Sequence, residues 1–72
     1  MSQNGRIIGY IMRNGSITQL DAMRDLGIMR LGARVFDLKE RGYNIETVMV
    51  WGTNRFGEPT RYARYYLKGD AE

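Results

Sequence analysis

The side chains best suited to chemistry in this 72-residue sequence are cations and hydrogen-bonding groups rather than nucleophiles. Cysteine and histidine are both absent, which removes thiolate nucleophiles, the commonest general base and the usual protein ligands of zinc. The carboxylates have ordinary roles as helix caps, helix-face charges or loop charges. We therefore expect no enzymatic activity, no cofactor and no metal site.

Arginine is the dominant cation of the sequence. Nine of the eleven basic residues are Arg, and the formal net charge is +3. Residues 51–68 carry four cations against Glu58 alone, whereas residues 69–72 are acidic. The planar guanidinium makes bidentate contacts with phosphates and with the edge of guanine. This charge pattern is compatible with a nucleic-acid partner, but many soluble proteins also have a basic surface.

One set of candidate contact residues lies in a predicted helix over residues 29–41. Its buried face is marked by apolar residues at helical spacing, which are Ile28, Leu31, Val35 and Leu38. The candidates opposite or beside that face are Arg30, Ala33, Arg34, Asp37 and Arg41. Arg pairs with guanine and Asp accepts from the cytosine amine, and the small Gly32 would permit close approach. The alternative is a solvated face held by charge pairs between successive turns.

A second set lies in and after a loop predicted over residues 52–59, which is rich in Gly, Thr, Asn and Pro. Its members are Thr53, Asn54, Arg55, Arg61 and Arg64. Arg55 falls at the tip of a hairpin, where it could contact phosphates or the minor groove. Side chains alternate along a strand, so Arg61 and Arg64 should lie on opposite faces. The alternative for Arg64 is stacking between Tyr62 and Tyr66.

Three helices are predicted to precede this hairpin. Apolar residues at helical spacing indicate helices over residues 3–13, 19–26 and 29–41, each followed by a glycine that can end it. Thr18 and Asp21 have the spacing of a capping box at the start of the second helix. Gly32 lies inside the third helix, at a cost of about 0.5–1 kcal/mol relative to Ala.

The C-terminal part changes to β-branched and aromatic residues. This composition predicts strands over residues 43–51 and 61–67 around the loop, with Ser16 and Ile17 forming a short extended step earlier in the chain. We predict an α+β fold, a winged helix-turn-helix of three helices followed by a two-stranded β-hairpin wing. One domain would span residues 1–68, with a disordered tail over residues 69–72.

The sequence also resembles a known family. The runs ITQLDA (residues 17–22), LGI (26–28) and ARVFDLKERGYNI (33–45) resemble those of small phage- and prophage-encoded winged helix-turn-helix proteins. The resemblance implies sequence-specific binding of double-stranded DNA, with the third helix in the major groove and the basic wing on the backbone or minor groove. It implies a transcriptional regulator or a recombination or excision accessory factor.

Other interpretations remain open. We expect Trp51 to be buried, but an exposed Phe36 and Trp51 could dock a protein partner, as in an interaction module or an inhibitor of a host enzyme. Tyr62 and Tyr66 beside Arg64 could instead stack the bases of a single strand. We expect a soluble, cytoplasmic monomer or weak homodimer with no membrane contact, located in the host cytoplasm if phage-encoded.

Overall fold

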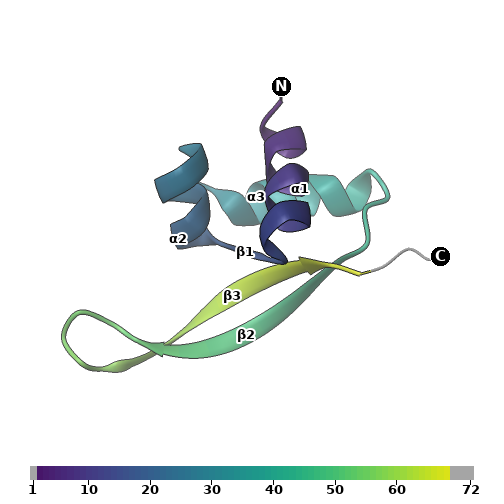
Figure 1. Cartoon of the computed structure of the whole chain (residues 1–72). Helices are drawn as coiled ribbons and strands as arrows, with labels where there is room; N and C mark the ends of the chain where they lie inside the picture. Colours follow the sequence, from purple (N-terminus) through teal and green to yellow (C-terminus); the bar gives the residue numbers. More distant parts are fainter. Residues whose placement is uncertain (1, 69–72) are drawn as a thin grey trace.

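The computed structural model describes residues 2–68 and places the helices on one side of a small antiparallel sheet (Figure 1). The elements in chain order are α1 (Gln3–Asn14), β1 (Ile17–Thr18), α2 (Gln19–Asp21), the π-helical turn η1 (Ala22–Leu26), α3 (Leu31–Glu40), β2 (Ile45–Thr53) and β3 (Pro59–Leu67). The predicted tail, residues 69–72, lies outside the described residues.

Helix α1 begins and ends where its residues predict. Ser2 Oγ accepts a hydrogen bond from the amide of Gly5 at 3.1 Å, which satisfies one of the free N–H groups of the first turn. Gly15 ends the helix in the left-handed conformation, with φ of +92°. Ile7 and Ile11, one turn apart, are buried, so the predicted apolar stripe faces the core.

The second helical segment has the predicted bounds, but part of it is a π-helix, which the sequence did not predict. Asp21 N donates to Thr18 Oγ1 at 3.2 Å and Thr18 N donates to Asp21 Oδ2 at 3.0 Å, which confirms the capping box. The last five residues form the π-helical turn η1. Ile28 N closes it by donating to Ala22 O at 3.0 Å, next to Gly27 with φ of +69°.

Helix α3 begins two residues later than predicted. Arg30 has φ of −128° and ψ of 70°, outside the helical region, so Met29 and Arg30 belong to the turn. The side chain of Gln19 holds this turn at both ends. Its Nε2 donates to Ile28 O at 2.9 Å, and its Oε1 accepts from the amide of Leu31 at 2.8 Å. A residue of α2 therefore sets where α3 starts.

The sheet contains one strand more than predicted. Strands β2 and β3 pair antiparallel from Ile45 opposite Leu67 to Thr53 opposite Pro59. The extended step at β1 joins the other edge of β3, with Ile17 opposite Tyr65, so the strand order is β1-β3-β2. Both hairpin strands are longer towards the tip than predicted, and the connecting loop shrinks to residues 54–58.

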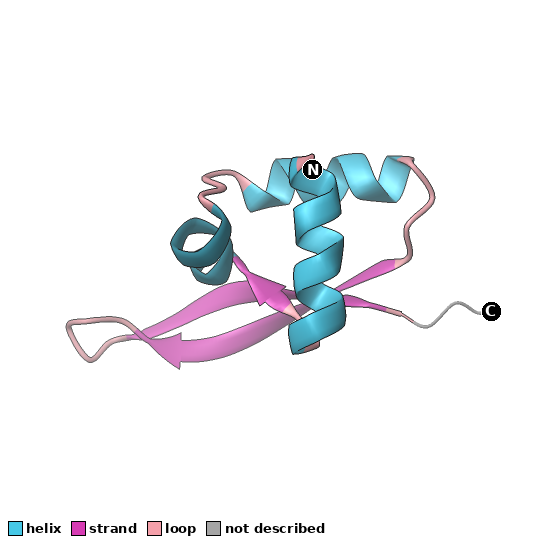
Figure 2. Ribbon diagram, turned by 45° about the horizontal axis from the view of Figure 1, so that its top comes forward, coloured by secondary structure: helices cyan, strands magenta, loops and turns pink. Residues whose placement is uncertain are grey.

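The buried core is confined to the helices and the base of the sheet. Its residues are Ile7, Ile11, Ile17, Ala22, Ile28, Leu31, Val35, Leu38 and Ile45. The tip of the hairpin contributes none of them and projects past α2 in both views (Figure 2). The predicted order of three helices and a hairpin wing is confirmed. None of the helices within residues 2–68 has the length and apolar character needed to cross a bilayer.

Candidate nucleic-acid interface

The exposed surface of α3 is divided into two flanks. The first, here called the α1 flank, contains Arg34, Asp37 and Arg41, which recur at helical spacing. Asp37 Oδ2 accepts from Asn4 Nδ2 of α1 at 2.7 Å and forms an ion pair with Arg41 Nε at 3.2 Å. The hydrogen bond from Asn4 lowers the pKa of Asp37, and the charges of Arg41 and Arg34 act in the same direction. Two of the predicted contact residues are thus already engaged within the chain.

The second flank, here called the wing flank, faces the hairpin and contains Gly32 and Phe36. A Cβ atom at Gly32 would lie 3.8 Å from the hydroxyl oxygen of Tyr65 on β3, so this side of α3 borders the sheet. Phe36 follows one turn later on the same side and is 65% exposed. The sequence did not reveal that Gly32 borders the sheet while Asp37, on the predicted outward strip, bonds to α1.

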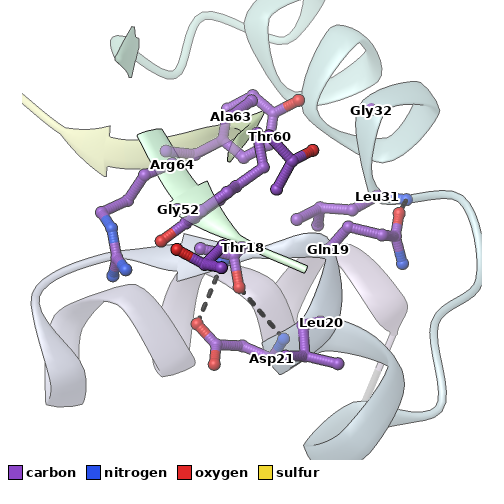
Figure 3. Close-up of a pocket in the computed structure, with 13 residues that line it drawn as sticks. Thr18, Gln19, Leu20, Asp21, Leu31, Gly32, Gly52, Thr60, Ala63 and Arg64 are labelled. Carbon is purple, nitrogen blue, oxygen red and sulfur yellow. Dashed lines mark hydrogen bonds between the residues drawn. The ribbon is translucent and has the colours of Figure 1, made fainter. Parts of the chain in front are cut away.

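A hollow of about 500 Å³ separates the start of α3 from the wing (Figure 3). Thr18 and Gln19 line it from the helix-turn-helix, Gly32 from α3, and Thr53 and Thr60 from the hairpin. Its walls combine apolar and aromatic side chains with the hydroxyl groups of threonines, and among the described residues the only carboxylate that lines it is that of the Asp21 cap. The hollow can therefore accept an anionic chain without direct repulsion from a free acid.

Two predicted candidates are exposed at the start of α3: Arg30 in the preceding turn and Ala33 in the first turn of the helix. They border a second hollow together with Gln3 of α1 and Arg34. No ion pair is found for Arg30 or Arg34 among residues 2–68. Among the arginines of the helix-turn-helix these two remain available to a ligand, since Arg24 and Arg41 are paired.

Arg24 is bound inside an acidic cluster formed by Asp21 and Asp25. It donates to Asp21 and to Asp25, each at 3.0 Å, while the hydroxyl of Tyr10 on α1 donates to Asp25 at 2.7 Å. The bonds from Arg24 and Tyr10 lower the pKa of Asp25 to about 2, and the bond to Asp25 raises the pKa of Tyr10. This cluster joins η1 to α1 and holds the guanidinium of Arg24 in ion pairs.

The wing candidates have different surroundings. Arg55 is exposed in the tip loop. Asn54 organises that loop, because its Oδ1 accepts from the amides of Phe56 at 2.9 Å and Glu58 at 3.1 Å. Thr53 lies at the end of β2, opposite Pro59, and not in the loop.

Arg61 and Arg64 lie on opposite faces of β3, as the alternation predicts. The Arg61 guanidinium carbon is 5.6 Å from the ring centroid of Trp51 across the hairpin. Arg64 instead reaches back to donate to Ser16 Oγ at 3.0 Å, and Figure 3 shows it directed away from Gly32 and Leu31. Of the two, Arg61 is the one on the outer part of the wing.

The expectation that Trp51 is buried is wrong, since its side chain is 67% exposed. The register puts Trp51 on the same sheet face as the buried Ile45, but six residues farther along β2. The helices cover that face only near its base, so the same side of the strand is core at one end and surface at the other (Figure 1).

Sequence reasoning also missed the residue that positions α3. The residue pattern predicts Gln19 only as the first residue of a helix, whereas its side chain bonds to Ile28 and Leu31, nine and twelve residues away. No local spacing marks such a contact. Within residues 2–68 no group of three acidic side chains is placed to hold a metal ion.

Comparison with known proteins gives one result. A family model described as a winged helix-turn-helix domain matches residues 2–69, which include all three helical segments and both strands of the hairpin. Neither the curated proteins nor the solved structures gave a significant match.

Proposed function

The chain belongs to the winged helix-turn-helix domain family, and from that membership we propose that it binds double-stranded DNA in a sequence-specific way. In this proposal α3 enters the major groove and the β2–β3 wing follows the neighbouring backbone or minor groove. The observation that carries the proposal is that Gly32 at the start of α3 and Thr53 and Thr60 of the wing border one hollow, in which the only described carboxylate, that of Asp21, is bound in a helix cap.

The start of α3 has the side chains that a base-reading helix needs. Gly32 and Ala33 are small and exposed, so the helix backbone can come close to the base edges. Arg30 and Arg34 flank them without an internal ion pair among the described residues. A guanidinium here can pair with guanine O6 and N7, which is the commonest specific contact in the major groove.

Asp37 and Arg41 have a supporting role in this proposal. The bond from Asn4 to Asp37 joins α3 to α1, and the ion pair with Arg41 holds the Asp37 carboxylate along α3. A recognition helix held in this way loses little freedom on binding, which limits the entropic cost. Asp37 retains acceptor capacity on its carboxylate and can still receive a cytosine amine.

The wing supplies contacts that do not depend on sequence. Arg55 and Arg61 are exposed, and Thr53 and Thr60 add hydroxyl groups along the hollow. Such groups contact phosphates and set the position of the protein on the duplex. With about four to six phosphates neutralised, the slope of log K against log salt should be roughly −4 to −5.

The biological role we propose is a phage-type regulator of transcription or an accessory factor in recombination or excision. Both roles require binding to a defined site and neither requires catalysis by the chain. The support is the resemblance of residues 17–45 to phage-encoded proteins of this fold.

The decisive experiment is selection of bound duplexes from a random pool at roughly 150 mM salt, followed by titration of the enriched duplex at several salt concentrations. We expect an enriched motif and a steep salt dependence. Retention of no duplex, or of all duplexes equally, would refute sequence-specific binding.

A second candidate function is docking of a protein partner. The exposure of Trp51 and Phe36 favours it, because large apolar side chains in water are common at interaction surfaces. A Trp51→Ala variant separates the two candidates. It should retain duplex binding if the wing acts on DNA through its cations, and loss of a protein complex without loss of duplex binding would assign Trp51 to a partner.

A further inference from the structure

The tip of the wing carries the most exposed large apolar side chain among residues 2–68. Phe56 is 79% exposed, and no residue of the tip loop belongs to the core or packs against it. The loop projects beyond α2 at the end of the molecule (Figure 2). Phe56 therefore contributes nothing to the folding core, and its exposure calls for another explanation.

The tip loop is built to hold Phe56 outward. Asn54 Oδ1 accepts from the amide of Phe56 at 2.9 Å, Asn54 N donates to Glu58 O at 2.9 Å, and Gly57 N donates to Asn54 O at 3.0 Å. Gly57 has φ of +80°, a conformation that suits glycine. These bonds close the loop on itself, so the ring is presented in a defined position instead of folding back over the strands.

The guanidinium next to Phe56 favours DNA as the target of the tip. Arg55 is exposed beside Phe56, whereas the carboxylate of Glu58, which is also exposed, is bonded within the loop and accepts from Asn54 Nδ2 at 3.0 Å. A dry apolar pocket on a protein would desolvate the neighbouring guanidinium at a cost. The minor groove instead attracts Arg by its negative potential, and its base steps accept apolar side chains.

The dimensions of the wing restrict how it can reach the bases. Strand β1 pairs with β3 only at Tyr65 and Arg64, so the hairpin beyond them is a two-stranded ribbon. Two strands about 4.8 Å apart with their side chains are wider than a minor groove of about 6 Å. Only the side chains of the tip can therefore enter the groove.

We propose that Phe56 is a wedge that enters the minor groove, opens one base-pair step and kinks the duplex. This inference rests on the proposed binding of duplex DNA and adds a distortion of the DNA to it. Arg55 holds the tip in the groove and Phe56 unstacks the bases. Pyrimidine–purine steps such as TA and CA/TG unstack most easily, so the wedge should select one of them.

The test uses the full chain and a duplex obtained by selection, with a donor and an acceptor dye at its two ends and 2-aminopurine at its flexible steps. Wild-type protein should raise both the energy transfer and the 2-aminopurine fluorescence. Phe56→Ala should lose both signals, while Kd rises by no more than about tenfold, since the larger protein surface that bent DNA covers offsets the cost of unstacking. Phe56→Leu, which retains an apolar wedge, should restore most of the bend.

The matched control is Met12→Ala, because Met12 is a similarly exposed apolar residue on α1, outside the proposed DNA surface. It should bend the duplex as the parent does.

A duplex that stays straight with wild type, or bends equally with Phe56→Ala, overturns the wedge but leaves duplex binding intact. A chain that binds no duplex overturns both proposals. If Phe56→Ala bends the duplex as the parent does but no longer binds vesicles of anionic lipid, the tip is a lipid contact and the wedge is again overturned.

Discussion

The helix layer and the outer part of the β2–β3 hairpin differ in how completely their side chains find partners within the chain. The helix layer supplies most of the buried core, and polar groups such as Gln19 and Asp37 are hydrogen-bonded between elements. The outer hairpin supplies no core residue, and Trp51, Phe56 and Arg55 are exposed there. The helix layer therefore provides the stability, whereas the outer hairpin can contact a partner without loss of the core.

The largest expected effect tests this division directly. Leu38 is 1% exposed in the core, so Leu38→Ala should lower the free energy of unfolding by about 2–5 kcal/mol. Trp51→Ala removes a larger side chain but should cost only about 0.5–1 kcal/mol, the value of an exposed cation–π contact with Arg61. Urea unfolding of both variants gives the comparison. Equal losses would mean that the outer hairpin is part of the cooperative core.

The next effect concerns the side chain that positions α3. Gln19→Ala leaves Ile28 O and the amide of Leu31 without their partner, which should cost about 1–3 kcal/mol of stability. Gln3→Ala is the control, because Gln3 is exposed on α1 and should change stability little. If both variants unfold at the same urea concentration, the turn before α3 is held by other contacts.

A third comparison tests whether α3 reads the base sequence while the wing contacts phosphates, by measuring both affinity and sequence preference of variants. Arg30→Ala or Arg34→Ala should weaken cognate binding by about 1–3 kcal/mol and relax preference at one or two base positions. Arg55→Ala should weaken cognate and scrambled duplexes alike and reduce the salt slope by about 1. Titrations of both duplexes at three salt concentrations distinguish these outcomes. A change of specificity with Arg55→Ala alone would assign sequence reading to the wing.

A smaller effect tests whether DNA approaches α3 closely. A Cβ at Gly32 meets only the Tyr65 hydroxyl at 3.8 Å, so Gly32→Ala should stabilise the fold by about 0.5–1 kcal/mol. Gly9→Ala in α1 should do the same, since its nearest neighbour is the flexible end of Arg13 at 3.3 Å. Only Gly32→Ala should weaken binding of the cognate duplex. Unchanged affinity in both variants would place the DNA away from the start of α3.

The smallest effect is a pH dependence within the helix layer. The folded-state pKa of Asp25 is about 2, below its ordinary value of 3.8, because Arg24 and Tyr10 bond to the carboxylate. A lowered pKa stabilises the fold fully above the ordinary value, and this contribution disappears as pH falls through the folded value. The melting temperature of Asp25→Asn should therefore lie below that of the parent at pH 6 and approach it near pH 2. A constant difference would exclude this linkage.

Local residue patterns were sufficient to predict much of the helix layer. The capping box of Thr18 and Asp21, the helix ends at Gly15 and Gly27 and the buried face of α3 all depend on residues within one or two turns of each other. Interactions at such short separations are encoded in neighbouring residues and need no knowledge of the rest of the fold. The order of three helices followed by a hairpin then indicated the winged arrangement, and the resemblance of residues 17–45 agreed with it.

The sequence by itself therefore determined the three helical segments, the two hairpin strands and the buried face of α3, because these follow from spacing along the chain. The tertiary structure alone decided that Trp51 is exposed, that β1 pairs with β3, that Gln19 holds the turn, and that Asp37 faces α1 while Gly32 faces the wing. Alternation along a strand predicts which side a residue faces but not how far the opposing layer extends. Contacts between distant segments depend on how the elements pack, and no local spacing records that packing.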